Sequence, residues 1–516
     1  MKKALTIVGL FIGINATAQI STTSTNNNSG VSSQSAIGLQ TTASGVASTA
    51  MGRETLASGH YSTAMGYLTT AGGETTASGV ASTAMGRETL ASGHYSSAMG
   101  HLTTASGETS TAMGRETEAT GNYSTAIGFL TNAYGGSSTA MGRQTLADAL
   151  YSTAMGHLTT ASGESSSSMG YQTTASGDFS TALGYLANAS GGSSTAMGRS
   201  TSATELYATA MGHETTASGN SSTATGYKTT ASGASSLAMG KETTAGGDNS
   251  IAMGYLTSAS GGSSIAMGRS TSASELYATA MGHETSASGN SSTATGYLTT
   301  ASGESSSSMG RETLASGPYS TALGYVTTAS GSASTVMGKG TIASDYGSLV
   351  IGTYNLSGST VTVDATLPNI GNTAFVIGNG TNAVKSDAFK VMYNGNATVS
   401  NDLTVSGDVV VSSDARLKAN IVSLGATLAK LLLIDGKTYT MKKDGKQKIG
   451  VLAQDIQKVF PELVTTDDKE MLAVNYQGLV PVLINALKEQ EGKICKQQSE
   501  IDELKVIVKQ FMSSKN

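Results

Sequence analysis

The 516-residue chain is poor in several residue types that compact enzymes use. It has no Trp, 7 Phe, 4 Pro and one Cys, and 13% of its residues are charged, against about 25% in ordinary globular domains. The single cysteine, Cys495, excludes an intrachain disulfide framework. The net charge of −5 includes no basic block, which argues against a nucleic-acid partner. The composition favours an elongated protein over a compact enzyme.

Long apolar runs are also lacking, and the short one that exists lies at the start. Lysines precede an apolar stretch over residues 5–14, and Ala16-Thr17-Ala18 fits the small-residue pattern of a cleavage site. This stretch is too short to span a bilayer. We therefore predict a signal peptide over 1–18, a disordered Ser/Thr/Asn-rich leader over 19–34, and a secreted or cell-surface protein without a transmembrane segment in the mature chain.

Glycine, in contrast, is abundant and periodic. Of the 64 Gly residues, one closes a phrase such as STAMG every 14 residues from Gly38 to Gly352, with one longer step of 20 residues between Gly66 and Gly86. This pattern gives 23 repeats, and a fixed short period is typical of a solenoid. At a strand spacing of about 4.8 Å, the repeats predict an array of about 110 Å.

The repeat consensus, A-S-G-x-x-S-T-A-M-G-x-x-T-x, predicts a coil of two short strands. In STAM, Thr and Met share one face and Ser and Ala share the other, while the Gly-bearing phrases turn the chain. We expect one Met or Leu in the core of each coil, so that coils must stack to be stable. The small Ala and Ser side chains predict close backbone approach on the other face, where a second and a third chain would fit.

The phrases SAIG (35–38), STAMG (48–52), STAIG (124–128) and STALG (180–184) resemble the head repeats of trimeric autotransporter adhesins of the YadA type. The resemblance covers about 35–355. It implies a mainly β fold, in which the repeats form a left-handed parallel β-roll solenoid that assembles as a homotrimer. We see no counterpart of that family's C-terminal membrane anchor, so attachment by that route is not expected.

Two ladders along the array bear on what it binds. The residue after each repeat Gly is mostly Arg, Tyr, His or Lys, beginning with Arg53 and Tyr67, and stacked coils would align these side chains. Such a ladder suits a host-surface glycan or a matrix protein, and the alternative is a solvated edge. A Thr ladder beginning at Thr55 suits either an ice-binding surface or, as in the adhesin-like repeat, turn geometry.

Metal chemistry has little support in the repeats. The six His residues lie on separate coils, where they are expected to be exposed side chains and not zinc ligands. The turns also lack the Asp that calcium-binding repeats need. We expect no metal and no cofactor.

The 14-residue rule ends after Gly352. Residues 356–411 indicate short strands joined by Asn-Gly turns, a β-rich neck. From residue 412 charge and Leu content rise, and we predict a small α+β domain over 412–490. Its elements are a short helix in TLAKLLLIDG, a hairpin around Asp444-Gly445, and a helix that ends before Pro461.

Residues 480–512 carry a heptad pattern. Apolar residues recur every seven residues, and a second layer three residues later contains Gln490 and Gln497, whose polar side chains can specify register and oligomer state. The pattern predicts a trimeric coiled coil, with a single amphipathic helix as the alternative. Cys495 lies outside the seam and is expected to be free, since three copies cannot all pair.

SDARLKANI (413–421), IGVLAQDIQKVFPELV (449–464) and VNYQGLVPVLINALKEQ (474–490) occur in this order before the heptads. Together they resemble the C-terminal intramolecular chaperone auto-peptidase domain of phage endosialidases and tail fibres, also found in the myelin regulatory factor family. The resemblance implies a domain that trimerises, guides the folding of the β-structured trimer before it, and cuts itself off with a Ser-Lys dyad. Ser413 and Lys418 occupy the two dyad positions.

The residues of this region agree with that chemistry. No His occurs in 413–516, so a Ser-His-Asp triad cannot form within the domain, and a lysine is the remaining base for a serine hydroxyl. A lysine acts as a base only after losing its proton, which burial favours, and a trimer interface would supply that burial. We expect the Ser413 hydroxyl to attack the carbonyl of Ser412 while Lys418 takes the proton. The bond after Ser413 is the alternative target, and a turn cap beside a surface lysine is the structural alternative.

The sequence thus predicts an exported, adhesin-like homotrimeric fibre with a self-cleaving chaperone, an autocatalytic serine endopeptidase of single turnover behind a non-enzymatic head. Identical repeats permit slips of 14 residues, and a C-terminal clamp would fix the register once. A phage-derived tail-fibre, receptor-binding protein with the same chaperone is the alternative, against which the signal peptide argues. A hydrolase acting on external substrates is disfavoured, because no acid pair or His cluster converges in the repeats.

Overall fold

The computed structural model divides the chain into two compact units, Met1–Leu403 and Thr404–Asn516, which are described separately. The predicted signal peptide, 1–18, and most of the leader lie outside the described residues. The structure describes residues 19–21, 34–68, 70–71, 79–356, 361–442, 444–466 and 470–515.

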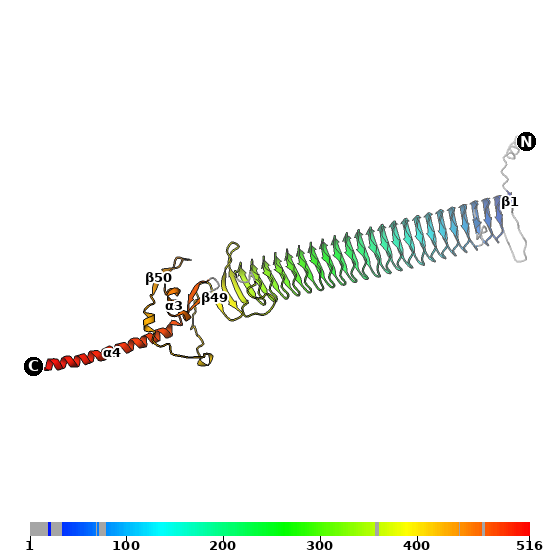
Figure 1. Cartoon of the computed structure of the whole chain (residues 1–516). Helices are drawn as coiled ribbons and strands as arrows, with labels where there is room; N and C mark the ends of the chain where they lie inside the picture. Colours follow the sequence, from blue (N-terminus) through cyan, green and yellow to red (C-terminus); the bar gives the residue numbers. More distant parts are fainter. Residues whose placement is uncertain are drawn as a thin grey trace, which may run out of the picture. The chain divides into compact units, whose positions relative to one another are not determined.

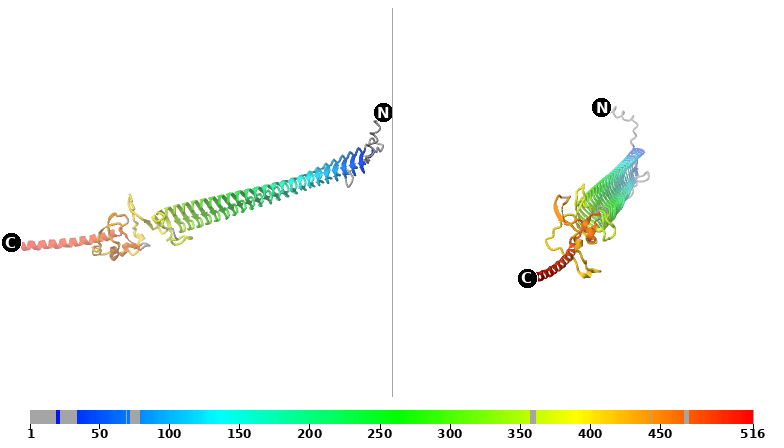
Figure 2. Two further views of the ribbon diagram at one scale, coloured as in Figure 1. Left: turned by 90° about the horizontal axis from the view of Figure 1, so that it is seen from above. Right: turned by 60° about the vertical axis from the view of Figure 1, so that its left-hand side comes forward.

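The first unit is a parallel β-roll (Figure 1). Each coil has one five-residue strand, from β2 (Ser35–Leu39) to β46 (Leu349–Thr353), and one two-residue strand, from β3 (Thr42–Ala43) to β45 (Ile342–Ala343). Within the described residues there are 23 long and 22 short strands. The two views in Figure 2 show the coils stacked in one column. The predicted solenoid of two-stranded, 14-residue coils is confirmed.

Equivalent residues of successive coils pair in register. Along the long strands Gly114 pairs with Gly128, and the 20-residue step does not disturb the ladder, because Gly66 pairs with Gly86. At the start, β1 (Gln19–Ser21) pairs antiparallel with β2. The expectation of a disordered leader is therefore wrong for these three residues.

The interior of the β-roll is filled by small side chains. Ala50 and its equivalents are fully buried, whereas Met51 lies on the outer side of the same strand and is half-buried. The expected Met or Leu core is wrong, because the two strands of a coil lie too close together for such side chains; Val336 and Val350, in the last two coils, are the bulkiest at the Ala50 position. The buried residues of one coil are Ser48, Ala50, Thr55, Ala57 and Gly59.

This arrangement reverses the two predicted faces. The Ala and Ser side, expected to meet other chains, faces the interior of its own coil. The Thr and Met side faces outward as an apolar ladder, on which Met239, Met309 and Met337 are 40%, 40% and 37% exposed. The partly exposed apolar side chains of the long strands thus lie on the outer surface of the β-roll.

Two left-handed residues turn each coil. In one coil these are Glu54, with a φ of 55°, and Tyr61, with a φ of 60°. Their N–H groups donate to carbonyls of the preceding coil, Glu54 to Leu39 at 2.8 Å and Tyr61 to Val46 at 2.7 Å. Each turn is therefore held by the coil before it, so the side chains at the turns stand on a rigid backbone.

Two buried polar side chains close the C-terminal end of the roll. The Oδ1 of Asn355 accepts from the N–H of Ile342 at 2.8 Å and its Nδ2 donates to the carbonyl of Ile342 at 3.0 Å. Asn355 thus takes the place of a further short strand beside β45. The Asp345 carboxylate accepts from the N–H groups of Thr362 and Thr373 at 2.6 and 2.7 Å, which satisfies its buried oxygens.

The unit ends in a small β-meander. Strand β47 (Thr373–Asn379) continues the long-strand sheet in parallel, and β48 (Asp387–Met392) and β49 (Ala397–Val399) add to it antiparallel. The predicted Asn-Gly turn joins β48 to β49 at Asn394 and Gly395. The first unit ends at Leu403, within the predicted neck of 356–411.

The second unit is a small α+β domain. Its hairpin of β50 and β51 and its helices α2 and α3 confirm the predicted elements, whereas the β52–β53 hairpin was not predicted. Ile456, Phe460 and Val482 form its core. The elements are η1 (Ala415–Leu417), α2 (Leu428–Leu431), β50 (Lys437–Thr440), β51 (Gln447–Gly450), α3 (Ala453–Val459), η2 (Pro461–Leu463), β52 (Val464–Thr466), β53 (Leu472–Val474) and α4 (Leu479–Ser513).

Helix α4 is 35 residues long, and only its N-terminal part packs against its own domain. Val482 and Ala486 are buried, and Glu489 accepts from the N–H groups of Thr427 and Leu428, so it caps the start of α2. The heptad residues further along are exposed, Leu487 by 70%. An apolar stripe therefore continues along α4 without a partner in the single chain.

Candidate active site and binding surfaces

Ser413 and Lys418, the pair that the resemblance to the chaperone domain singled out, meet in space. The Nζ of Lys418 donates a hydrogen bond to the Oγ of Ser413 at 2.6 Å. The two residues flank the single 3-10 turn of η1, which places side chains five residues apart on one side of the chain. Ser412 precedes the pair in an irregular stretch, so its carbonyl is the peptide group directly before the Ser413 hydroxyl.

Asp414 and Arg416 build the turn that brings the pair together. The Asp414 carboxylate caps η1 by accepting from the N–H of Arg416 at 2.8 Å. The Arg416 guanidinium in turn donates to the same carboxylate, with Nη2 at 2.7 Å from Oδ2. The turn closes with the N–H of Lys418 donating to the carbonyl of Ala415 at 3.1 Å. Asp414 thus caps a turn beside an exposed lysine, as the structural alternative from the sequence expected, whereas the part that Arg416 plays was not foreseen.

The electrostatics of this turn exclude Asp414 as the base for Ser413. Hydrogen bonds from the Arg416 side chain and backbone lower the pKa of Asp414 below its ordinary value. A carboxylate with a lowered pKa is a weaker base, and both of its oxygens already accept from Arg416. The amine of Lys418 is the group that contacts the serine hydroxyl.

Ser413 and Lys418 are exposed in the single chain. An ammonium group donates to the hydroxyl, whereas a neutral amine accepts the hydroxyl proton. The single chain leaves both side chains of the pair in contact with water. The arrangement can therefore generate a serine nucleophile once a second surface covers it.

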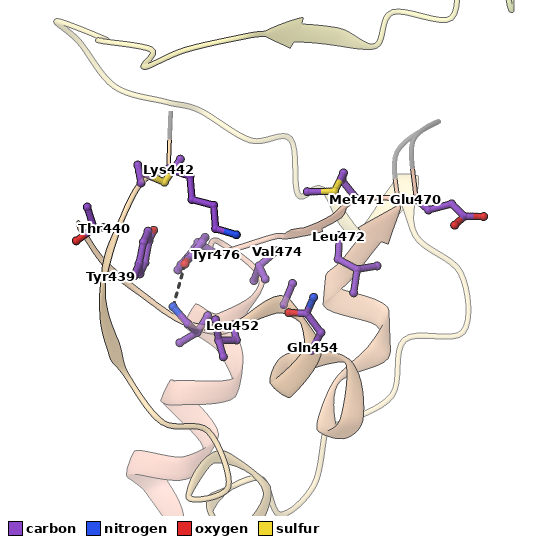
Figure 3. Close-up of a pocket in the computed structure, with 13 residues that line it drawn as sticks. Tyr439, Thr440, Lys442, Leu452, Gln454, Glu470, Met471, Leu472, Val474 and Tyr476 are labelled. Carbon is purple, nitrogen blue, oxygen red and sulfur yellow. Dashed lines mark hydrogen bonds between the residues drawn. The ribbon is translucent and has the colours of Figure 1, made fainter. Parts of the chain in front are cut away.

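A separate hollow of about 910 Å³ lies between the hairpin β50–β51, α3 and β53 (Figure 3). Figure 3 shows Tyr439 and Lys442 on one side and Met471 and Glu470 on the other. The hydroxyl of Tyr476 accepts from the N–H of Val451 at 3.1 Å and fixes one wall. Its lining is mainly apolar and aromatic and does not include the Ser-Lys pair. No sequence pattern pointed to this hollow, because Leu472–Val474 is too short to show a strand pattern.

The β-roll carries the predicted ladder of cations and rings. Arg53 pairs with Tyr67 in register, and the guanidinium carbons of Arg53 and Arg87 lie 5.3 and 5.9 Å from the Tyr67 ring centre. Elsewhere the rings stack on one another, as His213 does on Tyr227 at 5.1 Å. The cations and rings of the ladder thus largely contact one another between successive coils.

The Thr and His positions have structural roles. Thr55 and its equivalents are buried, which excludes the ice-binding interpretation, since such a surface must face water. The Nδ1 atoms of His60 and His94 accept from the N–H groups of Val46 and Val80, at 3.1 and 3.0 Å. In the part of the chain that the structure describes, His, Cys, Asp and Glu side chains nowhere gather in threes as metal ligands.

The fold and these surfaces first define a class, a β-roll repeat protein followed by a small domain with a Ser-Lys pair. Repeats between residues 35 and 326 match the family described as YadA head domain repeat, over more than half of the chain. The chain belongs to this family. Residues 413–465 match the family described as Chaperone of endosialidase, and this match begins at Ser413.

One curated relative is a phage protein. The chain is 37% identical over 86 residues to the Long tail fiber protein Gp37 of Escherichia phage AR1, and the match covers 15% of this chain and 8% of that protein. The chain thus spans a small part of that relative's length. Across the described ranges, no helix is both long and apolar enough to cross a membrane.

Proposed function

We propose that the chain is an exported homotrimeric fibre whose C-terminal domain directs trimerisation and then cleaves itself beside Ser413. The observation that carries the proposal is the 2.6 Å contact between Lys418 Nζ and Ser413 Oγ, at the first residue of the Chaperone of endosialidase match. The mature fibre would remain at the cell surface or in the medium, with a glycan or matrix ligand for the head. Its adhesin-like head repeats support this location.

The proposed reaction is an acyl shift followed by hydrolysis. Neutral Lys418 takes the Ser413 hydroxyl proton while Oγ attacks the carbonyl carbon of Ser412. The C–N bond between the two residues breaks, the proton passes to the leaving amine, and an ester remains. Water then hydrolyses the ester, which leaves a carboxylate on Ser412 and a free amine and hydroxyl on Ser413. The turn of η1 holds the two side chains for this attack.

Trimerisation is the proposed trigger. Two apolar surfaces lack a partner in one chain: the outer Thr and Met face of the long strands and the exposed stripe of α4. Packing three chains through both surfaces would bury them. If the same assembly covers η1, it desolvates Lys418 and favours its neutral form. Cleavage after assembly would remove the clamp and make the register permanent.

The test is a panel of full-length variants followed on denaturing gels with mass spectrometry of the fragments. We expect wild type to yield fragments that meet at Ser412 and Ser413, while Ser413→Ala and Lys418→Ala stay uncut and trimeric. Lys418→Arg should also stay uncut, because arginine keeps its proton. Ser412→Ala is the matched control, since it keeps the attacked carbonyl and should be cut. Cleavage of Ser413→Ala at the same bond would refute the dyad.

A phage-derived tail-fibre protein remains the second candidate, favoured by the match to a long tail fiber protein. Both candidates share the proposed self-cleaving domain, and they differ in export. A tail fibre assembles in the cytoplasm, whereas an exported fibre begins after a cleaved signal peptide. Sequencing the N-terminus of the protein from its native source separates them, because residue 19 is expected only for the exported protein.

A further inference from the structure

Exposed aromatic side chains recur at every second coil along one turn of the β-roll. They occupy the position of Tyr61, the second left-handed residue of the coil, and each is between 59% and 63% exposed. Because strands lie about 4.8 Å apart, rings two coils apart recur about every 9.6 Å. We call this set the aromatic row: Tyr61, Tyr95, Tyr123, Tyr151, Phe179 and Tyr207.

The turn itself does not need these rings. The intervening coils make the same turn with small residues, as at Ser137 and Ser165, whose φ values are 56° and 54°. Tyr123 and Tyr151 adopt φ values of 62° and 58°, a region that bulky side chains disfavour. Rings kept outside at a strained turn indicate a use for the side chain itself.

The surface between two rings of the row is hollowed. A hollow of about 540 Å³ lies between Tyr123 and Tyr151, over Gly136 and Ser137. A side chain at Gly136 would fill its floor, and a Cβ there would lie 3.0 Å from the Cδ2 of Leu150. Between these rings the hollow presents the backbone of Gly136, the hydroxyl of Ser137 and the exposed side chains of Tyr134 and Leu150.

The same construction recurs further along the row. Gly192 stands in the coil between Phe179 and Tyr207, and a Cβ there would lie 2.9 Å from the Cδ2 of Leu206. The leucine side chain of the next coil therefore lies close to each of these two glycines. This pairing of glycine and leucine is present in two of the five spaces between the rings, and it occurs again beyond the row, at Gly262 and Leu276.

The charge of the side chains on this turn narrows the class of ligand that the row can bind. Its four-residue segments from 92–95 to 316–319 contain no Lys or Arg. Their charged residues are all acidic, and the first four are Glu108, Asp148, Glu164 and Asp178. Acidic side chains repel anionic polymers and accept hydrogen bonds from hydroxyl groups.

We propose that the aromatic row binds an extended, uncharged polysaccharide, a ligand class that rests on the proposed role of the fibre as an adhesin. The C–H faces of sugar rings stack on the electron-rich faces of aromatic rings. Sugar hydroxyls then find acceptors in Ser137, Asn122 and the acidic side chains of the turn. A β-1,4-linked chain repeats every second sugar, over a length close to two strand spacings, about 9.6 Å.

A polysaccharide fits the row better than a protein partner does. Protein partners bury contiguous patches with an apolar core, whereas these rings are separated by coils that carry Ala, Thr or Ser at the same position. A linear polymer instead gains affinity from many weak, equally spaced contacts. The row supplies six such contacts in line.

The test measures retention of the full chain on insoluble cellulose and chitin, with alginate and a collagen-coated resin as comparison matrices. The double variant Tyr123→Ser/Tyr151→Ser should lower retention on cellulose or chitin about tenfold. These variants should fold, because serine stands at the same turn in neighbouring coils. The matched control is Tyr277→Ser/Tyr319→Ser, whose rings are equally exposed, at 63% and 59%, but have no aromatic partner two coils away.

The proposal is supported if wild type and control are retained on cellulose or chitin and the row variant is not. It is overturned if wild type binds neither matrix, if both double variants bind alike, or if the row variant loses binding to alginate or collagen instead. The same assay on uncut Ser413→Ala separates this proposal from the processing reaction. Because the row lies within one chain, its binding does not depend on cleavage.

Discussion

Replacing Gly156 by Ala should open the β-roll locally. A Cβ at Gly156 would lie 2.0 Å from the carbonyl oxygen of Gly170 in the next coil, and the φ of Gly156 is 128°. The backbone conformation alone costs about 1–3 kcal/mol for a residue with a side chain. Relieving the clash separates two coils and weakens ladder hydrogen bonds worth about 1 kcal/mol each. We expect a loss of about 3–5 kcal/mol in local stability.

Hydrogen exchange of the backbone amides measures this loss coil by coil. Since about 1.4 kcal/mol corresponds to a factor of ten, amides around residues 142–170 should exchange at least about 100-fold faster. The control is Gly246→Ala, whose Cβ would meet nothing closer than the Cα of Ser260 at 3.7 Å. Its exchange should stay unchanged or slow slightly, because Ala has less conformational freedom when unfolded. Equal exchange in the two variants would refute the argument.

Further predictions concern assembly and the interior. Leu487→Ala/Ile494→Ala should cost at least about 2 kcal/mol per chain in the assembled stripe and slow cleavage in proportion to the trimer that is lost. Sedimentation measures the trimer and gel time courses measure cleavage, with exposed Lys496→Ala as the control. Unchanged cleavage without trimer would contradict the proposed trigger. Thr103→Val should raise the free energy of unfolding by about 1 kcal/mol, because the buried Thr103 hydroxyl has no hydrogen-bond partner among the residues that the structure describes. A loss as large as that of Thr103→Ala would show that the hydroxyl is satisfied.

The sequence determined the period but not the inside of the coil. The Gly ladder from Gly38 to Gly352 gives the coil length directly, because one Gly stands at the same position of every long strand. The strand STAM has two faces of different size, and its alternation does not say which face is interior. That choice depends on the gap between the two strands of a coil, which admits Ala50 and excludes Met51.

The candidate active site was predictable in its residues and not in its environment. Ser413 and Lys418 meet because a single local turn joins them. A Ser and a Lys five residues apart are common, so the order of several motifs, and not this spacing, singled out the pair. The ion pair of Asp414 with Arg416 that forms this turn has no distinctive sequence pattern. In the proposed mechanism the cover over Lys418 comes from other chains, which the local sequence does not encode. The aromatic row is also hard to see in the sequence. Its period is two coils, so its Tyr and Phe do not belong to the 14-residue consensus.

Two mass measurements on the purified wild-type protein test whether it is a trimer that cuts itself at Ser413. Native mass spectrometry gives the mass of the assembly, and denaturing mass spectrometry of the same sample gives the masses of its chains. We predict a native trimer whose denatured chains end at Ser412, together with a fragment that begins at Ser413. A native trimer made only of chains that still join Ser412 to Ser413, or cleaved chains from a monomer, would contradict it.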